Sequence, residues 1–385
     1  MEEWRRKMKY DLKIITSGDC NFNCSYCYER DDRDVIPKRI TSNTIEGIQK
    51  LIMNDINIIS SISFMGGETF LSIRDIIKIL FPIRKILKEC DVEISLFTNG
   101  SIFNQYIKRF YKIMSKIKSP TVYITDHLLR LNIIDDGALS QHIKFLKDES
   151  IDYKLKVIID RHRLLNFDQT LNYLITNHDE NVELVLAYYD KFNKVDECSL
   201  NKFISYISDN MNLIPVDILK KILRLFKCDR IIDPDFKLSQ IRCGAGVTEL
   251  AVSGDGRIHG CENVVGASDS EYINVNDVSS ITQLSNIYRD FQMFKSKYYN
   301  QNETCLKCLF KSLCAQCRYN FTTNKDIYTD KPEEICNFTK LIYLYSLRLG
   351  LIISKYIISV YKHRLSNQMD KLVKLQESVD VSKYS

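Results

Sequence analysis

Short apolar segments alternate with longer amphipathic segments along the first half of the chain. The short segments are rich in Ile, Val, Leu, Phe and Tyr, the residues that favour strands, and the longer ones repeat apolar residues at helical spacing. The pattern predicts six strands, at Lys9–Thr16, Ser61–Met65, Val92–Thr98, Thr121–Asp126, Tyr153–Asp160 and Val182–Tyr188. A helix is expected between each strand and the next.

The first two predicted helices show start signals. Asn43 and Glu46 are placed like a capping box, and Ser72 directly precedes the second helix, with Asp75 in its first turn. The apolar face of the first helix consists of Ile45, Ile48, Leu51, Ile52 and Ile56. Such a face is typical of a helix that packs against a sheet.

A strand and a helix recur about every thirty residues, which is the rhythm of βα units that build a parallel sheet. The predicted fold class is α/β. Six such units with right-handed crossovers curl into an open, partial (β/α)6 barrel of the TIM type, and ligands bind at the carboxyl ends of its strands. Cys20, Gly66 and Asn99 each follow a predicted strand end.

The periodicity changes in the second half of the chain, which indicates further domains. We expect the barrel to occupy residues 1–215, followed by a helical bridge over 216–240 and a cysteine-rich domain over 241–340. Loop-rich segments of this kind lack a core and use metal to stabilise the fold. An amphipathic helix and a polar tail are predicted for 341–385.

Composition narrows the class of protein. A chain of 385 residues with 45% hydrophobic residues suits a globular protein with more than one domain. The net charge of +5 is scattered, so no electrostatic stripe supports nucleic-acid binding. No secretory signal is visible, and Arg348 and Lys355 interrupt the apolar stretch near the C-terminus. We therefore expect a cytoplasmic protein with no membrane partner.

Ten of the 13 cysteines lie in two clusters, and a reducing cytosol favours metal ligation or catalysis over disulfides. The first cluster is Cys20-x3-Cys24-x2-Cys27. If its three sulfurs hold a four-iron cluster, one iron keeps an open coordination position. The alternative is a structural zinc site completed by a distant residue.

This first loop, with Tyr26 before its last cysteine, resembles the signature of the radical S-adenosylmethionine (SAM) enzymes, C-x3-C-x-aromatic-C after the first strand. The resemblance implies that the three thiolates bind three irons of a [4Fe-4S] cluster and that SAM chelates the fourth. Reductive cleavage of SAM would then give a 5′-deoxyadenosyl radical, which abstracts a hydrogen atom from the substrate.

A second segment, Gly66-Gly67-Glu68, resembles the Gly-Gly-Glu motif that contacts the methionine moiety of SAM in that family, with Thr69 where proline is usual. Glycines allow close backbone approach, and a carboxylate can pair with an ammonium group. Thr98-Asn99-Gly100 also resembles the family. The resemblance implies SAM contacts from Tyr26, Gly66, Gly67, Glu68 and Asn99.

The second cysteine cluster resembles the SPASM domain, which carries auxiliary clusters on radical SAM enzymes that mature peptides and proteins. The spacing between Cys314 and Cys317 is one residue shorter than in the pattern. The resemblance implies that one [4Fe-4S] cluster is ligated by Cys305, Cys308, Cys314 and Cys336, and the other by Cys243, Cys261 and Cys317. Two zinc knuckles are the alternative to these iron–sulfur clusters. The set of Cys243, Cys261 and Cys317 lacks a fourth ligand, for which Cys228 is a candidate.

The combined resemblance implies a radical SAM/SPASM peptide maturase that forms a thioether or carbon–carbon crosslink, or a related change, in a ribosomally made peptide. Glu262, directly after Cys261, is a candidate base, although a solvated loop carboxylate is the alternative. The runner-up is a sulfatase-maturing enzyme that makes formylglycine, whose relatives carry aspartate there. A non-catalytic zinc-binding interaction protein is the alternative from another class.

The predicted cofactors are SAM and three [4Fe-4S] clusters, and the predicted partners are a peptide substrate and a reductant protein, flavodoxin or ferredoxin. Cys20 lies too close to the start for the peptide-binding module of roughly 80 residues that often precedes such barrels. We therefore expect either a separate leader-binding protein or a contribution from the C-terminal helix.

Overall fold

The structure is a computed structural model that describes the chain in separate ranges. These are 9–24, 27, 35–126, 137–159, 163, 166–176, 181–186, 194–225, 248–262, 265, 273–284, 340, 344–345 and 347–356. The described residues include most of the predicted barrel and a part of each of the three segments expected to follow it.

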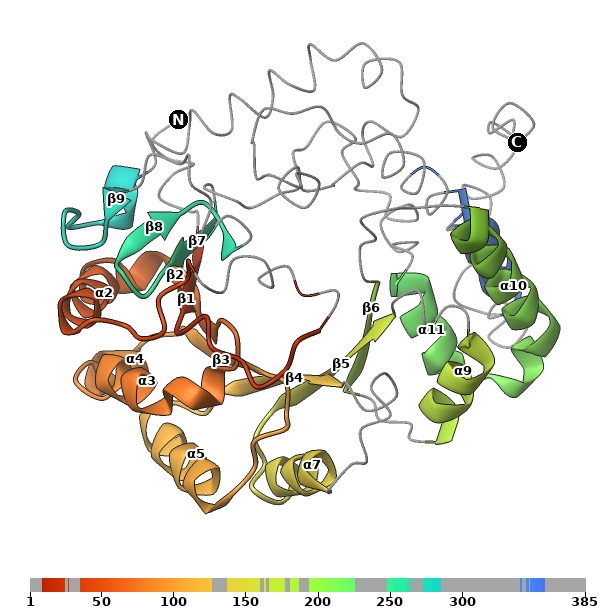
Figure 1. The fold of residues 1–385 in the computed structure, drawn as a ribbon, viewed down its shortest axis with the longest axis horizontal. Helices are drawn as coiled ribbons and strands as arrows, with labels where there is room; N and C mark the ends of the chain where they lie inside the picture. The colour runs from red at the N-terminus through yellow and green to blue at the C-terminus, as the bar shows by residue number, and fades with distance from the viewer. Residues whose placement is uncertain are drawn as a thin grey trace, which may run out of the picture.

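A single curved sheet organises the described residues (Figure 1). Its strands are β1 Tyr10–Ile15, β2 Ile59–Met65, β3 Glu93–Thr98, β4 Thr121–Asp126, β5 Tyr153–Ile159, β6 Val182–Leu186, β7 Glu249–Val252, β8 Arg257–His259 and β9 Ile273–Asn274. Their order in the sheet is β6-β5-β4-β3-β2-β1-β7-β8-β9. Strands β1 to β6 are parallel to one another, and β7 pairs parallel with β1.

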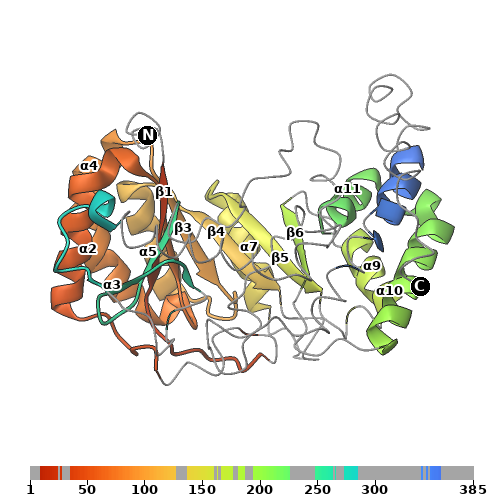
Figure 2. The same cartoon turned by 90° about the horizontal axis from the view of Figure 1, so that it is seen from above.

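Helices line the convex side of this sheet in Figures 1 and 2. The α-helices are α2 Ser42–Asp55, α3 Ile73–Leu80, α4 Arg84–Glu89, α5 Gln105–Ile117, α7 Ala138–Asp148, α9 Phe167–Thr176, α10 Lys194–Asn210 and α11 Val216–Leu225. Short 3-10 helices span Ile56–Ile58, Thr69–Ser72 and Met211–Leu213. The prediction of an α/β fold with a partial barrel is confirmed, and each of the six predicted strands is present.

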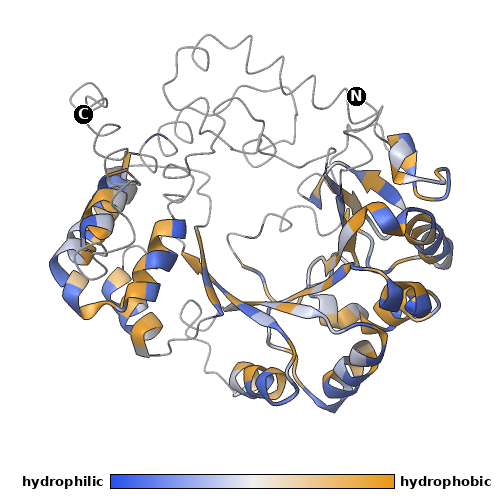
Figure 3. Ribbon diagram, turned by 180° about the vertical axis from the view of Figure 1, so that it is seen from behind, coloured by the Kyte–Doolittle hydropathy of each residue, from blue (hydrophilic) through white to orange (hydrophobic). Residues whose placement is uncertain are grey.

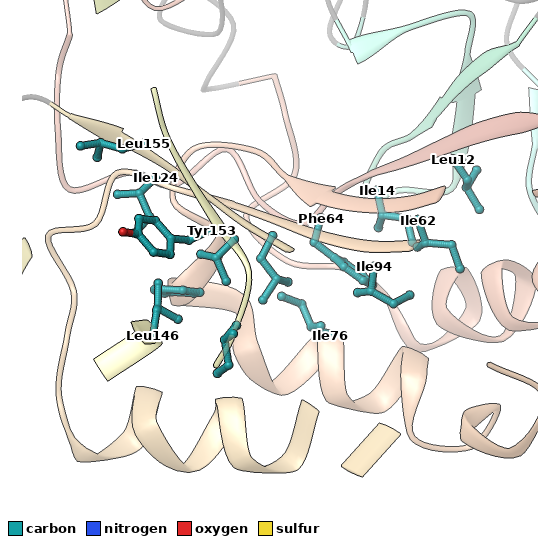
Figure 4. Packing of buried hydrophobic residues seen from close by; sticks show 14 of the residues in the cluster. Leu12, Ile14, Ile62, Phe64, Ile76, Ile94, Ile124, Leu146, Tyr153 and Leu155 are labelled. Atoms are coloured by element: carbon teal, nitrogen blue, oxygen red, sulfur yellow. The ribbon is translucent and has the colours of Figure 1, made fainter. Parts of the chain in front are cut away.

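The main core lies between the sheet and the helices. Alternate strand residues point to this side, because successive side chains of a strand face opposite ways. Figure 4 shows this packing, with Leu12, Ile14, Ile62 and Phe64 of two neighbouring strands in the same cluster as Ile76 of α3. The helices carry both hydrophobic and hydrophilic positions (Figure 3), as expected for elements with one buried face.

The concave face of the sheet has a different composition. In β1 the buried Leu12 and Ile14 alternate with the half-buried Lys13, which points the other way. Ser63 of β2 and Ser95 of β3 share this face, because Lys13 is in register with Ser63 and Ser63 with Ser95. The interior of the barrel is therefore lined in part by polar side chains.

The predicted capping box of the first helix is wrong. The N-cap is Thr41, whose backbone is extended and whose Oγ1 accepts a hydrogen bond from the Thr44 amide at 3.1 Å. Asn43 and Glu46 therefore lie inside the helix, where they cannot act as cap and N3 partner. Ser72 does occupy the N-cap position of α3, but its side chain makes no capping hydrogen bond.

Part of the predicted C-terminal segment is described. Residues 347–356 are helical and lie beside α10 in Figures 1 and 2. Leu349 and Ile353, which are four residues apart, are fully buried and belong to the main core. Within the described ranges, no helix is long and apolar enough to cross a membrane.

We predict that Leu96→Ala lowers the free energy of unfolding by about 2–5 kcal/mol, because Leu96 in β3 is fully buried and its removal leaves a cavity. Leu213→Ala is the matched control, since Leu213 is 73% exposed, and we expect a change within about 0.5 kcal/mol. Urea unfolding of the anaerobically purified variants measures both. Equal effects of the two substitutions would contradict the described core.

Candidate functional site

The first cysteine loop follows β1 directly. Cys24 is buried, Cys20 and Cys27 are half-buried, and none of the three is in a disulfide. The Cys27 amide donates to the Cys24 carbonyl at 3.1 Å, which holds the backbones of these two cysteines together. Tyr26, predicted to contact SAM, lies outside the described residues.

The end of β2 packs its backbone directly on the segment that leads into this loop. The Gly67 amide donates to the Ser17 carbonyl at 2.7 Å, and the Glu68 amide donates to the Asp19 carbonyl at 2.8 Å. A Cβ atom on Gly66 would lie 2.4 Å from the Ser17 carbonyl oxygen, and one on Gly67 would lie 2.2 Å from that of Asp19. Both glycines are therefore needed for the position of the cysteine loop.

Glu68 is fully buried and connects two strand ends. Its Oε1 accepts hydrogen bonds from the Phe70 amide at 3.0 Å and the Thr98 hydroxyl at 2.7 Å, and its Oε2 accepts one from the Asn99 amide at 2.8 Å. Burial raises the pKa of the Glu68 carboxyl above its usual range, and the three donors partly oppose that shift. A contact between Glu68 and the SAM ammonium group stays a prediction.

Asn99 reaches back from the end of β3 to the first cysteine. Its Nδ2 lies 3.8 Å from the Cys20 sulfur and donates to Asn21 Oδ1 at 2.8 Å. Its Oδ1 accepts from the Ser101 amide at 3.0 Å, and Asn21 Nδ2 donates to Ser101 Oγ at 2.8 Å. Asn21 and Ser101 were not predicted from the sequence, because no motif or spacing marks them and the contacts between the two segments span about 80 positions.

The donor set of the loop suits an iron–sulfur cluster. Among the residues that the structure describes, no three His, Cys, Asp or Glu side chains converge on a point where a single metal ion would bind. A four-iron cluster instead takes one thiolate per iron, so its cysteines ligate separate atoms. The Cys20 sulfur also has nearby N–H donors, as is usual for ligands of metal centres.

A charged cluster lies on the concave face of the sheet. The Lys13 ammonium donates to Glu262 Oε2 at 2.7 Å and to Glu249 Oε2 at 3.1 Å. Burial lowers the pKa of Lys13, but the two carboxylates, Glu262 foremost, outweigh that effect and the pKa is raised. The Glu262 side chain is only 19% exposed, so the alternative of a solvated loop carboxylate does not describe it.

A second lysine shares this face. Lys156 Nζ lies 4.7 Å from the centroid of the Phe97 ring and 4.8 Å from that of Tyr123, and the two rings stack at 4.6 Å. Burial, aided by the positive charge of Lys13, lowers the pKa of Lys156, although Glu183 opposes the shift. The alternation of strand residues could have placed Lys156, Phe97 and Tyr123 on the concave face. It could not have predicted that the two aromatic rings stack.

The second cysteine cluster is described at one position. Cys261 is buried, with 4% exposure, immediately before Glu262. The other predicted auxiliary ligands lie outside the described residues, and so does Cys228. These ligands are Cys243, Cys305, Cys308, Cys314, Cys317 and Cys336. Strands β7 and β8 place Cys261 beside the barrel, because β7 extends the sheet at its β1 edge.

A barrel of this kind, with three cysteines after its first strand and a Gly-Gly-Glu turn after its second, defines the radical SAM class of domain. Residues 14–125 match the family model described as the Radical SAM superfamily. An uncharacterized protein of Methanocaldococcus jannaschii is 25% identical over 179 residues, which cover 44% of this chain and 59% of that protein. The chain thus spans about 59% of the curated relative that it matches.

Solved structures share the fold. The structure of anSMEcpe with bound AdoMet and the Cp18Cys peptide has a TM-score of 0.65 at 16% identity, and covers 90% of this chain and 99% of its own. Streptococcus suis SuiB bound to its precursor peptide SuiA has a TM-score of 0.58 at 16% identity, with 87% of this chain and 78% of its own covered.

Residues 14–125 therefore form a domain similar to the radical SAM superfamily, and this similarity supports an enzyme. Such a domain implies SAM and a [4Fe-4S] cluster as cofactors, and the cysteine loop after β1 provides the thiolates that this cluster takes.

We predict that Gly67→Ala prevents assembly of the first cluster, because the new methyl group would meet the Asp19 carbonyl and displace the loop. Iron content should fall by about four atoms per protein. Gly137→Ala is the control, since Gly137 has a φ of +82° and is strained by alanine, yet the nearest atom to its Cβ is 3.4 Å away, on Gln141. Full iron content in Gly67→Ala would contradict the described packing.

Proposed function

We propose that this enzyme modifies a ribosomally made peptide by radical hydrogen abstraction, forming a thioether or carbon–carbon crosslink or a related change. The observation that carries the proposal is the Lys13–Glu262 ion pair on the concave face of a radical SAM barrel. It supplies a fixed carboxylate inside the barrel, next to Cys261, a predicted auxiliary-cluster ligand. Support also comes from anSMEcpe and SuiB, which share the fold and are seen with peptides bound.

The residues have separate tasks in this proposal. Cys20, Cys24 and Cys27 hold the first cluster, and Gly66-Gly67-Glu68 with Asn99 form the edge against which SAM lies. When bound, the cluster and SAM would supply radical chemistry at this edge, and the SPASM cysteines would hold two auxiliary clusters that could take up an electron. The ligand sets are those given above for Cys243, Cys261 and Cys317 and for Cys305, Cys308, Cys314 and Cys336.

Glu262 accepts the proton that the substrate releases when it loses this electron. A general base must be ionised and held within reach of the proton. The Lys13 ammonium fixes the position of the carboxylate, because it donates a hydrogen bond to Glu262 Oε2 at 2.7 Å. Glu249 also pairs with the Lys13 ammonium, at 3.1 Å, and helps to balance its charge. Unlike Glu262, Glu249 does not follow Cys261 in the chain.

Formylglycine formation on a sulfatase is the second candidate. It would use the same arrangement, with Glu262 deprotonating the substrate cysteine or serine. Sulfatase-maturing relatives carry aspartate at this position, so the longer glutamate favours the peptide crosslink. We further propose that a flavodoxin or ferredoxin supplies electrons to the first cluster. Any leader peptide is bound either by a separate protein or with a contribution from the C-terminal helix.

We predict that the anaerobically purified protein contains iron and sulfide and cleaves SAM to 5′-deoxyadenosine when reduced with dithionite. Replacement of Cys20, Cys24 and Cys27 by alanine should abolish cleavage, because no thiolate remains to hold the first cluster. Iron analysis and chromatography of the nucleoside measure the two effects. Zinc without iron would refute the proposal and favour an interaction protein. Undiminished cleavage in the triple variant would instead refute the assignment of Cys20, Cys24 and Cys27 to the first cluster.

We predict that Glu262→Gln retains SAM cleavage but forms modified peptide at least about 100-fold more slowly, as expected for loss of a general base. The substrate is a ribosomally made peptide that the unaltered enzyme modifies, and mass spectrometry detects the loss of two hydrogens. Glu249→Gln, which removes the other carboxylate on Lys13, is the matched control and should keep the rate. An equal loss in both variants would assign Glu262 a structural role.

A further inference from the structure

The Cys20 sulfur lies within hydrogen-bonding range of two N–H groups from different parts of the chain. The Phe22 amide donates to it at 3.4 Å, within the cysteine loop itself. Asn99 Nδ2 donates to it at 3.8 Å, from the end of β3. A thiol sulfur accepts hydrogen bonds weakly, but a metal-bound thiolate carries negative charge and accepts them more strongly.

The orientation of the Asn99 amide is fixed by its other partners. The Ser101 backbone amide can only donate, and it lies 3.0 Å from Asn99 Oδ1, so the amide oxygen must face Ser101. The nitrogen is then left to face Cys20 and Asn21, whose Oδ1 accepts from it at 2.8 Å. A flipped amide would place two acceptors together at Asn21 and two donors together at Ser101.

The backbone of Asn99 is fixed as well. Its amide donates to Glu68 Oε2 at 2.8 Å, and Glu68 is fully buried with two further donors on its other oxygen. A buried carboxylate with several donors resists movement, because any shift would leave a polar group unpaired. The Asn99 side chain is therefore held against Cys20, because its backbone is hydrogen-bonded to the buried Glu68 carboxylate.

We propose that Asn99 is a positioning residue for the first cluster, which donates its side-chain N–H to the iron-bound Cys20 thiolate and raises the reduction potential of that cluster. A hydrogen bond to a ligating sulfur withdraws negative charge from it, which favours the reduced form of the centre. The inference rests on the cluster being bound by Cys20, as under the proposed function. It assigns Asn99 a task that does not require contact with SAM.

The test is a redox titration of the holoenzyme followed by electron paramagnetic resonance, in the absence of SAM and peptide. The signal of the first cluster is identified by its loss in the Cys20, Cys24, Cys27→Ala variant. Asn99→Asp keeps the size and the oxygen that faces Ser101 but replaces the N–H donor by an anionic oxygen. We expect its midpoint potential to shift to a lower value, with Asn99→Ala shifted less in the same direction.

Asn54→Asp is the matched control, because Asn54 lies in α2 before the start of β2 and its Nδ2 donates to the Ser279 carbonyl, so the potential should not change. An unshifted potential in Asn99→Asp and Asn99→Ala, with full iron content, would overturn the inference. A changed affinity for SAM with an unshifted potential would also overturn it, and would assign Asn99 to SAM binding instead. Neither result would affect SAM cleavage by the unaltered enzyme, which tests the proposed function separately.

A measurement on the unaltered enzyme covers the case in which the variants fail to assemble the cluster. With asparagine labelled by ¹⁵N in its side-chain amide, pulsed electron paramagnetic resonance of the reduced first cluster should show coupling to this nitrogen through the N–H···S bond. The Phe22 amide carries no label and does not contribute. Absence of the coupling would overturn the inference.

Discussion

The contact between the end of β2 and the segment before Cys20 is a backbone-to-backbone contact, and the geometry of the candidate site depends on it. Gly66 and Gly67 bring their backbone so close to Ser17 and Asp19 that a Cβ atom on either would overlap a carbonyl oxygen. A carbonyl of the main chain cannot move aside as a flexible side chain can. The position of the cysteine loop therefore depends on glycine at both positions, because glycine has no Cβ atom.

This contact also determines where the neighbouring polar groups lie. Glu68 follows the two glycines, and its carboxylate spans from β2 to the end of β3, where it holds the Asn99 backbone. Asn99 in turn reaches the Cys20 sulfur. Buried polar groups are tolerated when each has partners, and here the partners form one connected network across three strand ends.

The two faces of the sheet have different roles: the convex face stabilises the fold, and the concave face carries the charged side chains of the candidate site. The convex face packs against the helices with apolar residues such as Leu12 and Phe64, and this burial stabilises the fold. The concave face carries Lys13, Lys156 and Glu262, which are partly removed from water. Charges in such positions are stabilised by their partners, a carboxylate pair for Lys13 and two aromatic rings for Lys156.

The sequence by itself determined the strands, their order along the chain and the residues at their ends, because strand and helix periodicity and the spacings around Cys20 and Gly66 are local properties. It did not determine the helix cap at Thr41, which depends on the backbone conformation before the helix. Only the tertiary structure decided that Glu262 pairs with Lys13, 249 positions away, and that Asn99 faces Cys20. Such contacts follow from the pairing of β7 with β1 and from the close approach of glycine backbones, which no spacing in the sequence encodes.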